Sequence, residues 1–162
     1  MRTNELYRLY EIQLVWKPLV RHSQRPVIHS SVDVIKILLD YVEIETLGLY
    51  ERVIGIFLSN TNKLLGLRTF HLGANAMAIV DPNLICKYAL KGNARGLILC
   101  HNHPSGNANP SGGDVQTTNK IKDALGLIDV KLMDHIIFTD EANNFFSFCD
   151  EGFLPETNKS NL

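Results

Sequence analysis

The chain has 162 residues, of which 45% are hydrophobic and 20% are charged, a length and balance typical of a single soluble globular domain with its own core. Its formal net charge of -1 argues against strong, nonspecific binding to nucleic acid and leaves only a local basic patch open. No apolar run is long enough to cross a bilayer, and the N-terminus lacks the basic head and apolar block of a secretory signal, so we expect a cytoplasmic protein.

The first predicted elements are a strand and a helix. Alternating polar and apolar residues predict a strand over residues 6–16, and a polar, proline-marked connection follows through residue 26. Ser30 and Asp33 match the capping box that begins a helix. The apolar stripe of that helix consists of Val34, Ile35, Leu38, Leu39 and Val42.

A hairpin is predicted next, because apolar segments at residues 51–59 and 64–73 flank a polar turn at residues 60–63. Gly55 lies inside the first of these strands. Because glycine has no side chain, this position would let another element approach closely.

Another helix and a central strand follow the hairpin. Asp81 and Pro82 are typical of the N-cap and first position of a helix, which we expect to end near Gly92 with the glycine in a left-handed conformation. Residues 96–100, GLILC, form a short continuous apolar run, as in a central strand that is covered on both faces.

A third helix and two closing strands, at residues 134–139 and 145–149, complete the predicted elements. The apolar positions of the third helix are Val115, Ile121, Leu125 and Ile128. The order of elements predicts an α/β (α+β mixed) domain with a single mixed β-sheet flanked by helices. An exposed edge of the closing hairpin could pair with a second copy of the chain.

The chemistry of the sequence is concentrated in CHNHPSGNANPSGGD, residues 100–114. His101 follows the central apolar run and therefore lies at the carboxyl end of a strand, where open α/β sheets bind ligands. His103 points the same way if the chain stays extended, and Asp114 begins the next helix with its carboxylate directed toward the strand end. Two histidines and one carboxylate leave one position of a tetrahedral zinc ion open, as in catalytic sites.

A water in that open position would lose its proton near neutral pH, and a carboxylate is needed to accept the proton. Glu51 is the best candidate for this base. It shares a strand face with Val53, Gly55 and Phe57, and it is a charge at the edge of an apolar stripe.

Each of these residues also has a structural explanation. A lone histidine at a strand end is more often a surface or hydrogen-bonded core residue than a ligand, and Ser111 with Asp114 matches a helix-capping box. Glu51 taken singly is typical of a solvated carboxylate. His135 is interpreted as structural, with a contact behind a metal ligand as the alternative. The histidines outside any ligand pattern are His22, His29 and His71.

Residues 101–106, HNHPSG, with Pro110, Ser111 and Asp114 resemble the motif of JAB/MPN metalloproteases in the form carried by the RadC family. Its other similar segments are LLGLRTFHLG, ALKGNARGLILC, LMDHIIF and FSFCDEG. The resemblance implies a fold related to that of cytidine deaminases. The boundaries that follow are 1–27 for an N-terminal strand and connection, 28–154 for a RadC-like JAB/MPN domain and 155–162 for a C-terminal tail.

The resemblance also implies roles for single residues. Glu51 matches the glutamate that acts as general base, with Glu43 and Glu45 as alternative positions. Ser111 matches the serine that helps to hold the oxyanion of the tetrahedral intermediate. The residues that match the family's zinc ligands are His101, His103 and Asp114.

Together these features predict a zinc-dependent hydrolase of peptide or isopeptide bonds, with Zn2+ as its cofactor and a peptide or protein of unknown identity as its substrate. Zinc deamination of a nucleobase is disfavoured, because the sequence lacks the H-x-E and P-C-x-x-C signatures of that reaction.

A non-enzymatic alternative stays open. It is a nucleic-acid-linked binding domain, associated with DNA repair or a mobile element, whose metal site is structural or vestigial. RadC proteins usually carry an N-terminal helix-hairpin-helix segment that binds DNA. No such hairpin pair is recognisable in this sequence, so we expect a stand-alone catalytic domain. DNA binding has no support from the charge, and no membrane association is expected.

Overall fold

The computed structural model of the protein describes residues 21–73 and 80–154, so the predicted strand at 6–16 and the tail at 155–162 lie outside the described residues. Within the described ranges, no helix is both long and apolar enough to cross a membrane. The elements in chain order are η1 (His22–Gln24), α2 (Ser31–Tyr41), η2 (Ile44–Thr46), β1 (Glu51–Leu58), β2 (Leu64–Gly73), α4 (Pro82–Lys91), β3 (Gly96–Asn102), α5 (Gly112–Gly126), β4 (Lys131–Phe138) and β5 (Phe145–Ser147).

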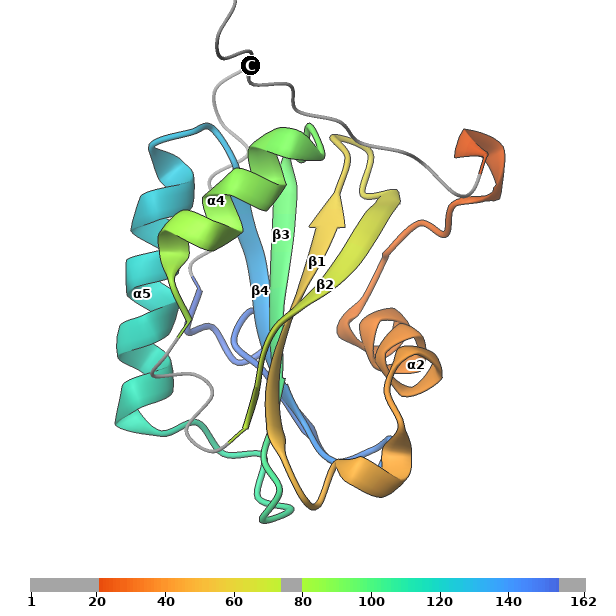
Figure 1. Ribbon diagram of the computed structural model, residues 1–162, viewed down its shortest axis with the longest axis vertical. Coiled ribbons are helices and arrows are strands. Elements are labelled where there is room, and N and C mark those ends of the chain that lie inside the picture. The colour runs from red at the N-terminus through yellow and green to blue at the C-terminus, as the bar shows by residue number, and fades with distance from the viewer. Residues whose placement is uncertain (1–20, 74–79, 155–162) are drawn as a thin grey trace, which may run out of the picture.

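The strands form one five-stranded sheet in the order β2-β1-β3-β4-β5. Neighbouring strands are antiparallel except for β3 and β4, which are parallel and are joined by α5, as a parallel crossover requires. Helices α4 and α5 cover one face of the sheet, and α2 covers the other (Figure 1). The prediction of a mixed sheet flanked by helices is confirmed.

Apolar side chains bury both faces of the sheet. Along β1, Val53 and Phe57 belong to the core cluster beneath α4 and α5, whereas Ile54, Ile56 and Leu58 belong to the cluster beneath α2. Every residue of β3 is buried, which confirms the expectation of a central strand covered on both faces.

Helices α2 and α4 begin at the residues that local sequence signals predict. Ser30 and Asp33 form a reciprocal capping box at the start of α2. At the start of α4, the carboxylate of Asp81 accepts a hydrogen bond from the N–H of Asn83 at 2.9 Å, and Pro82 occupies the first turn.

The end of α4 corrects the prediction of a left-handed glycine. Gly92 is right-handed, with a φ of -80°, and the left-handed residue is Asn93, with a φ of 50°. The N–H of Ala94 donates to the carbonyl of Ala89 at 2.9 Å, so the chain reverses one residue later than expected. Asparagine tolerates this conformation better than most side chains do.

Several other boundaries differ from the prediction. β3 continues beyond the apolar run through Asn102, and β4 begins earlier, at Lys131. Both strands are longer because they pair with each other, and the local sequence pattern does not predict that pairing. α5 ends before Ile128, since the left-handed Asp129, with a φ of 55°, turns the chain toward β4. β5 ends at Ser147.

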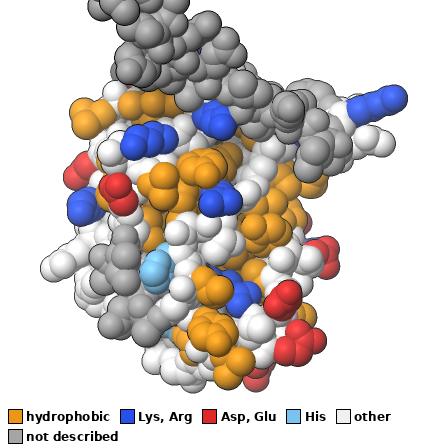
Figure 2. Space-filling view, in the orientation of Figure 1, with side chains coloured by type: hydrophobic (Ala, Val, Ile, Leu, Met, Phe, Trp, Pro, Cys, Tyr) orange, Lys and Arg blue, Asp and Glu red, His pale blue; other side chains and the backbone are white. Residues whose placement is uncertain are grey.

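Charged groups are mixed with apolar ones on the surface in Figure 2. On this face, Lys and Arg side chains stand singly among hydrophobic side chains, with Asp and Glu toward the edges. Among the described residues of this face, the basic groups form no continuous patch of the kind that binds a phosphate backbone.

Gly55 confirms the predicted close approach. A Cβ atom at this position would lie 2.7 Å from Cε2 of Phe70 and 3.3 Å from Cδ1 of Leu97. The Phe70 ring packs edge-on against the rings of Phe57 and Tyr88, so it has little freedom to move away.

We expect Gly55→Ala to lower the free energy of unfolding by about 1–3 kcal/mol, the usual cost of overpacking a core. Urea unfolding followed by circular dichroism measures this change. Gly48→Ala is the matched control, because an added Cβ there meets nothing within 4 Å. Equal stability of Gly55→Ala and the wild type would contradict the inferred packing.

Candidate metal centre

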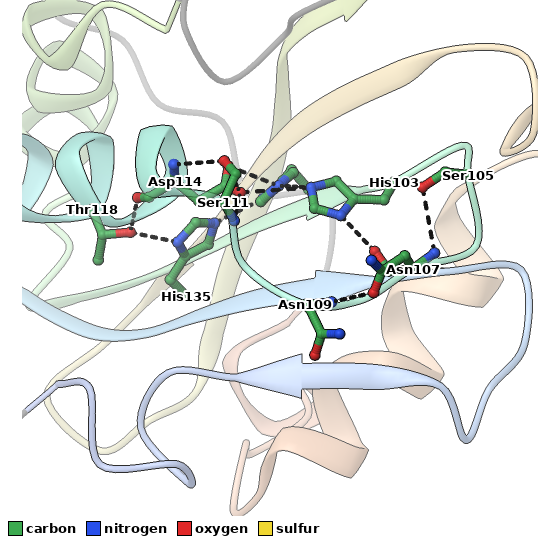
Figure 3. A network of polar contacts seen from close by, with 9 residues as sticks. His103, Ser105, Asn107, Asn109, Ser111, Asp114, Thr118 and His135 are labelled. Carbon is green, nitrogen blue, oxygen red and sulfur yellow. Dashed lines mark hydrogen bonds and ion pairs between the residues drawn. The ribbon is translucent and has the colours of Figure 1, made fainter.

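Three potential metal ligands converge at the carboxyl end of β3. His101 is the second-to-last residue of β3, His103 directly follows the strand, and Asp114 lies in the first turn of α5. One ligand atom from each residue lies within 4.8 Å of the other two, and His101 and Asp114 are buried. The structure therefore brings together the three residues that the motif predicts as ligands, and Figure 3 shows two of them, His103 and Asp114. His29 and His71 lie outside this group.

The ligand atoms are in direct contact. His101 Nε2 lies 2.9 Å from His103 Nε2 and 3.2 Å from Asp114 Oδ1, and His103 Nε2 lies 3.7 Å from Asp114 Oδ2. On its other side, His103 Nδ1 lies 2.6 Å from the main-chain carbonyl of Asn107. A carbonyl only accepts, so the neutral His103 ring carries its proton on Nδ1 and a bare lone pair on Nε2.

The loop between the ligands is held by its own polar contacts. The N–H of His103 donates to the carbonyl of Phe138 at 3.2 Å, and the N–H of Gly106 returns to the carbonyl of His103 at 3.0 Å. This turn uses the positive φ of 75° at Gly106. From the side of β5, the Asn144 amide donates to the carbonyl of Gly106 at 2.9 Å. These contacts fold the loop back so that Asp114 reaches the strand end.

Asp114 contacts the helix terminus and the histidines at once. Its Oδ2 atom accepts hydrogen bonds from the N–H of Ser111 at 2.7 Å and from the Ser111 hydroxyl at 2.6 Å. In return, the Ser111 hydroxyl oxygen accepts from the N–H of Asp114 at 3.2 Å, which completes a capping box. Oδ1 stays directed at His101. Capping and the approach to the histidines are compatible, because a carboxylate has two oxygens.

His135 lies behind His101, on the neighbouring strand β4. Its Nε2 atom is 2.8 Å from His101 Nδ1, and its ring is fully buried. His135 therefore contacts a predicted metal ligand from behind, which is the alternative role considered for it from the sequence. The sequence signal is a histidine inside the otherwise apolar segment LMDHIIF, but the parallel pairing that places it beside β3 is not visible in the sequence.

Burial and hydrogen bonding set the charge states of His101, His135 and Asp114. Burial lowers the pKa of His101, although Asp114 opposes the shift, and burial lowers the pKa of His135 well below its ordinary value. Burial alone would raise the pKa of Asp114, but its close contact with the His101 ring and its hydrogen bonds from Ser111 hold it well below its ordinary value. Neutral imidazole and ionised carboxylate are the forms that bind a metal cation.

This donor set fits a divalent metal ion. Two imidazole nitrogens and a carboxylate oxygen face one another at 2.9 and 3.2 Å, and imidazole with carboxylate is a usual ligand set for zinc. The group could therefore hold a metal.

Glu51 begins β1 and faces the same side of the sheet as His101. The strand pairing places Val53 opposite His101, and Glu51 shares the face of Val53 because side chains alternate along a strand. Burial dominates the pKa of His101, and the charge of Glu51 acts against that shift. Glu43 and Glu45 are exposed in the segment that precedes β1.

Sequence reasoning missed Asn102, whose side chain is fully buried on the opposite face from the histidines. Its amide group donates to the carbonyls of Leu47 at 2.8 Å and Tyr50 at 2.9 Å, and its Oδ1 accepts from the N–H of Arg52 at 2.9 Å. These bonds hold the main chain on both sides of Glu51. The available signal was its place between two histidines, where alternation turns the amide inward and burial demands partners.

Comparison with known proteins finds similarity across the region that contains the fold and the site. A family model described as RadC-like JAB domain matches residues 28–153. A UPF0758 protein of Flavobacterium johnsoniae is 48% identical over 99 residues, which cover 61% of this chain and 42% of that protein. A UPF0758 protein of Pseudoalteromonas translucida is 34% identical over 144 residues, which cover 88% of this chain and 62% of that protein. The chain therefore spans less than two thirds of the length of these two relatives. For a UPF0758 protein of Vibrio cholerae, 38% identity extends over 110 residues, 67% of this chain and 68% of that protein.

Asp134 is a buried carboxyl group next to His135, on the other face of β4. It accepts hydrogen bonds from the N–H groups of His135 at 2.7 Å and Cys149 at 2.9 Å, and from the Ser147 hydroxyl at 2.6 Å. Because Cys149 donates here and not to a strand, β5 is shorter than the predicted strand at 145–149. Burial raises the pKa of Asp134 to about 6 despite these hydrogen bonds.

We expect the Asp134 carboxyl group to make the free energy of unfolding fall as the pH rises from 3.8, the ordinary pKa of a carboxyl group, to about 6. The folded protein holds the Asp134 proton more tightly than the unfolded chain does, and that advantage is lost as the pH passes through the folded pKa. Asp134→Asn removes the titration and keeps an amide oxygen as acceptor. Urea unfolding of both proteins at several pH values measures the effect. A stability difference that does not vary with pH would show that Asp134 is not responsible.

Proposed function

The chain belongs to the RadC-like JAB domain family, and on this premise we propose that it is a zinc-dependent hydrolase that cleaves peptide or isopeptide bonds. The observation that carries the proposal is the convergence of two imidazole nitrogens and one carboxylate at the end of the central strand. Three protein ligands are typical of catalytic zinc sites, whereas structural sites use four.

Zinc, when bound by this group, supplies Lewis acidity that polarises a carbonyl and makes water a stronger nucleophile. The chain contributes ligands that are already oriented. The carbonyl of Asn107 orients the His103 ring from behind, and Ser111 orients the Asp114 carboxylate through two hydrogen bonds. Such contacts behind a ligand fix its direction and strengthen metal binding.

Glu51 is the proposed general base. Its carboxylate takes the proton of the attacking water and passes it to the leaving amine nitrogen. Two observations support Glu51 over the alternatives Glu43 and Glu45: its face of the sheet is that of His101, and Asn102 fixes the main chain on both sides of it.

Ser111 is the proposed donor to the oxyanion of the tetrahedral intermediate. Its side-chain hydrogen is donated to Asp114 Oδ2 at 2.6 Å. The role therefore requires the hydroxyl to turn from Asp114 to the substrate oxygen. The N–H of Ser111 keeps a separate bond to the same carboxylate at 2.7 Å, so Asp114 stays oriented when the hydroxyl turns.

We expect purified wild-type protein to hold about one zinc ion per chain and His103→Ala to lose it, because one of the three proposed ligands is removed. Elemental analysis after resupply of zinc measures the content. His29→Ala is the matched control, since His29 is exposed and lies outside the ligand group. Wild-type protein without metal would contradict the proposal and favour the nucleic-acid-linked binding domain.

We expect Glu51→Gln to keep its zinc and to lose at least about 100-fold in cleavage rate, the usual contribution of a general base. The names of the UPF0758 relatives state no substrate, so the assay uses a fluorogenic peptide pool and a lysine isopeptide, each with and without a chelator. Glu45→Gln is the matched control and should cleave like the wild type. Activity that survives in Glu51→Gln and disappears in Glu45→Gln would reassign the base.

A further inference from the structure

We propose that Thr118 and His135 select the ring tautomer of His101 and thereby present its Nε2 lone pair to the metal ion. The inference rests on the metal site of the proposed function, but not on the hydrolytic reaction. Neither residue belongs to the group of ligand atoms, so both are positioning residues.

The contacts that link Thr118, His135 and His101 form a relay of hydrogen bonds. It begins at Thr118, a residue of α5 that is only 2% exposed. Its hydroxyl oxygen lies 2.6 Å from the main-chain carbonyl of Asp114 and 2.6 Å from Nδ1 of His135. The carbonyl only accepts, so the single hydroxyl hydrogen is donated to Asp114. The hydroxyl oxygen must then accept from His135, which places a proton on Nδ1 of that ring.

His135 passes this constraint to His101. The His135 ring is fully buried and stacks on Phe148, with ring centroids 4.6 Å apart, so a second proton and its charge would be costly. A neutral ring with its proton on Nδ1 is an acceptor at Nε2. That Nε2 atom lies 2.8 Å from His101 Nδ1, and His101 is therefore the donor.

His101 consequently carries its proton on Nδ1 and a bare lone pair on Nε2. The Nε2 atom faces Asp114 Oδ1 at 3.2 Å, so the relay leads from the main-chain carbonyl of Asp114 back to the side chain of the same residue. Figure 3 shows the Thr118 hydroxyl directed at the ring of His135. The closed ring of contacts spans α5, β4 and β3 and fixes two proposed ligands relative to each other.

A purely structural role for Thr118 makes a different prediction. Threonine often bonds to the carbonyl one helical turn earlier without any effect outside the helix. If the relay operates, removing the hydroxyl lets His135 move its proton to Nε2 and donate to His101 Nδ1. The His101 proton then moves to Nε2, the atom that should bind the metal. Thr118→Val removes the hydroxyl and keeps the branched shape, whereas Thr118→Ser keeps the hydroxyl.

The first test is nitrogen NMR of isotope-labelled histidine side chains in the metal-free protein at neutral pH. We expect His101 to be protonated at Nδ1 in the wild type and in Thr118→Ser, and at Nε2 in Thr118→Val. Thr117→Val, at a half-buried position of the same helix, is the matched control and should resemble the wild type. A wild-type His101 that is protonated at Nε2 would overturn the proposal, even if no variant folds.

The second test is zinc affinity, measured by competition with a chelating dye. We expect Thr118→Val to bind zinc about 10- to 100-fold more weakly, the usual effect of removing a contact behind a ligand, and Thr118→Ser to bind like the wild type. Unchanged affinity in Thr118→Val, or equal weakening in both variants, would overturn the relay. Wild-type protein that binds no zinc would overturn the proposed function, and the tautomer measurement would then judge the relay by itself.

Discussion

The site depends on one constraint: the histidine at the end of the central strand is fully buried, and each of its ring nitrogens needs a partner. His101 Nδ1 meets His135 on one side, and His101 Nε2 meets His103 and Asp114 on the other. Burying a polar ring is costly unless such contacts are made. Strands β3 and β4, the first turn of α5 and the loop between the proposed ligands therefore meet at this ring.

The sheet topology brings these partners from both sides of β3. The antiparallel neighbour β1 starts where β3 ends, which places Glu51 on the face of His101. The parallel neighbour β4 places His135 beside β3. A parallel pair needs a crossover, and the first turn of the crossover helix α5 carries Asp114. The predicted base, a predicted ligand and the residue behind the site thus follow from one arrangement of three strands.

Several side chains serve the fold and the candidate site together. Asp114 caps α5 through one carboxylate oxygen and faces the histidines through the other. Asn102 occupies the strand position between His101 and His103, yet its amide secures the chain around Glu51 on the opposite face. Asp114 is therefore both the capping residue and the metal ligand that the sequence predicts, and the two interpretations are compatible.

Features whose physical cause acts within a few residues were predictable from the amino-acid sequence alone. The capping boxes at Ser30 and Ser111 are visible in the sequence because a side chain reaches an N–H group within one helical turn. The two faces of β1 are predictable because side chains alternate along a strand. The early start of β4 and the short β5 were not predictable, since distant hydrogen bonds set those boundaries. The contacts of Asn102, Thr118 and His135 depend on how distant segments pack together. Apart from the Asp114 carbonyl, which lies four residues before Thr118, their partners are remote in the chain: 50 residues away for Asn102 and Arg52, 34 for His135 and His101, and 17 for Thr118 and His135. No local pattern specifies which remote groups a buried polar side chain will meet.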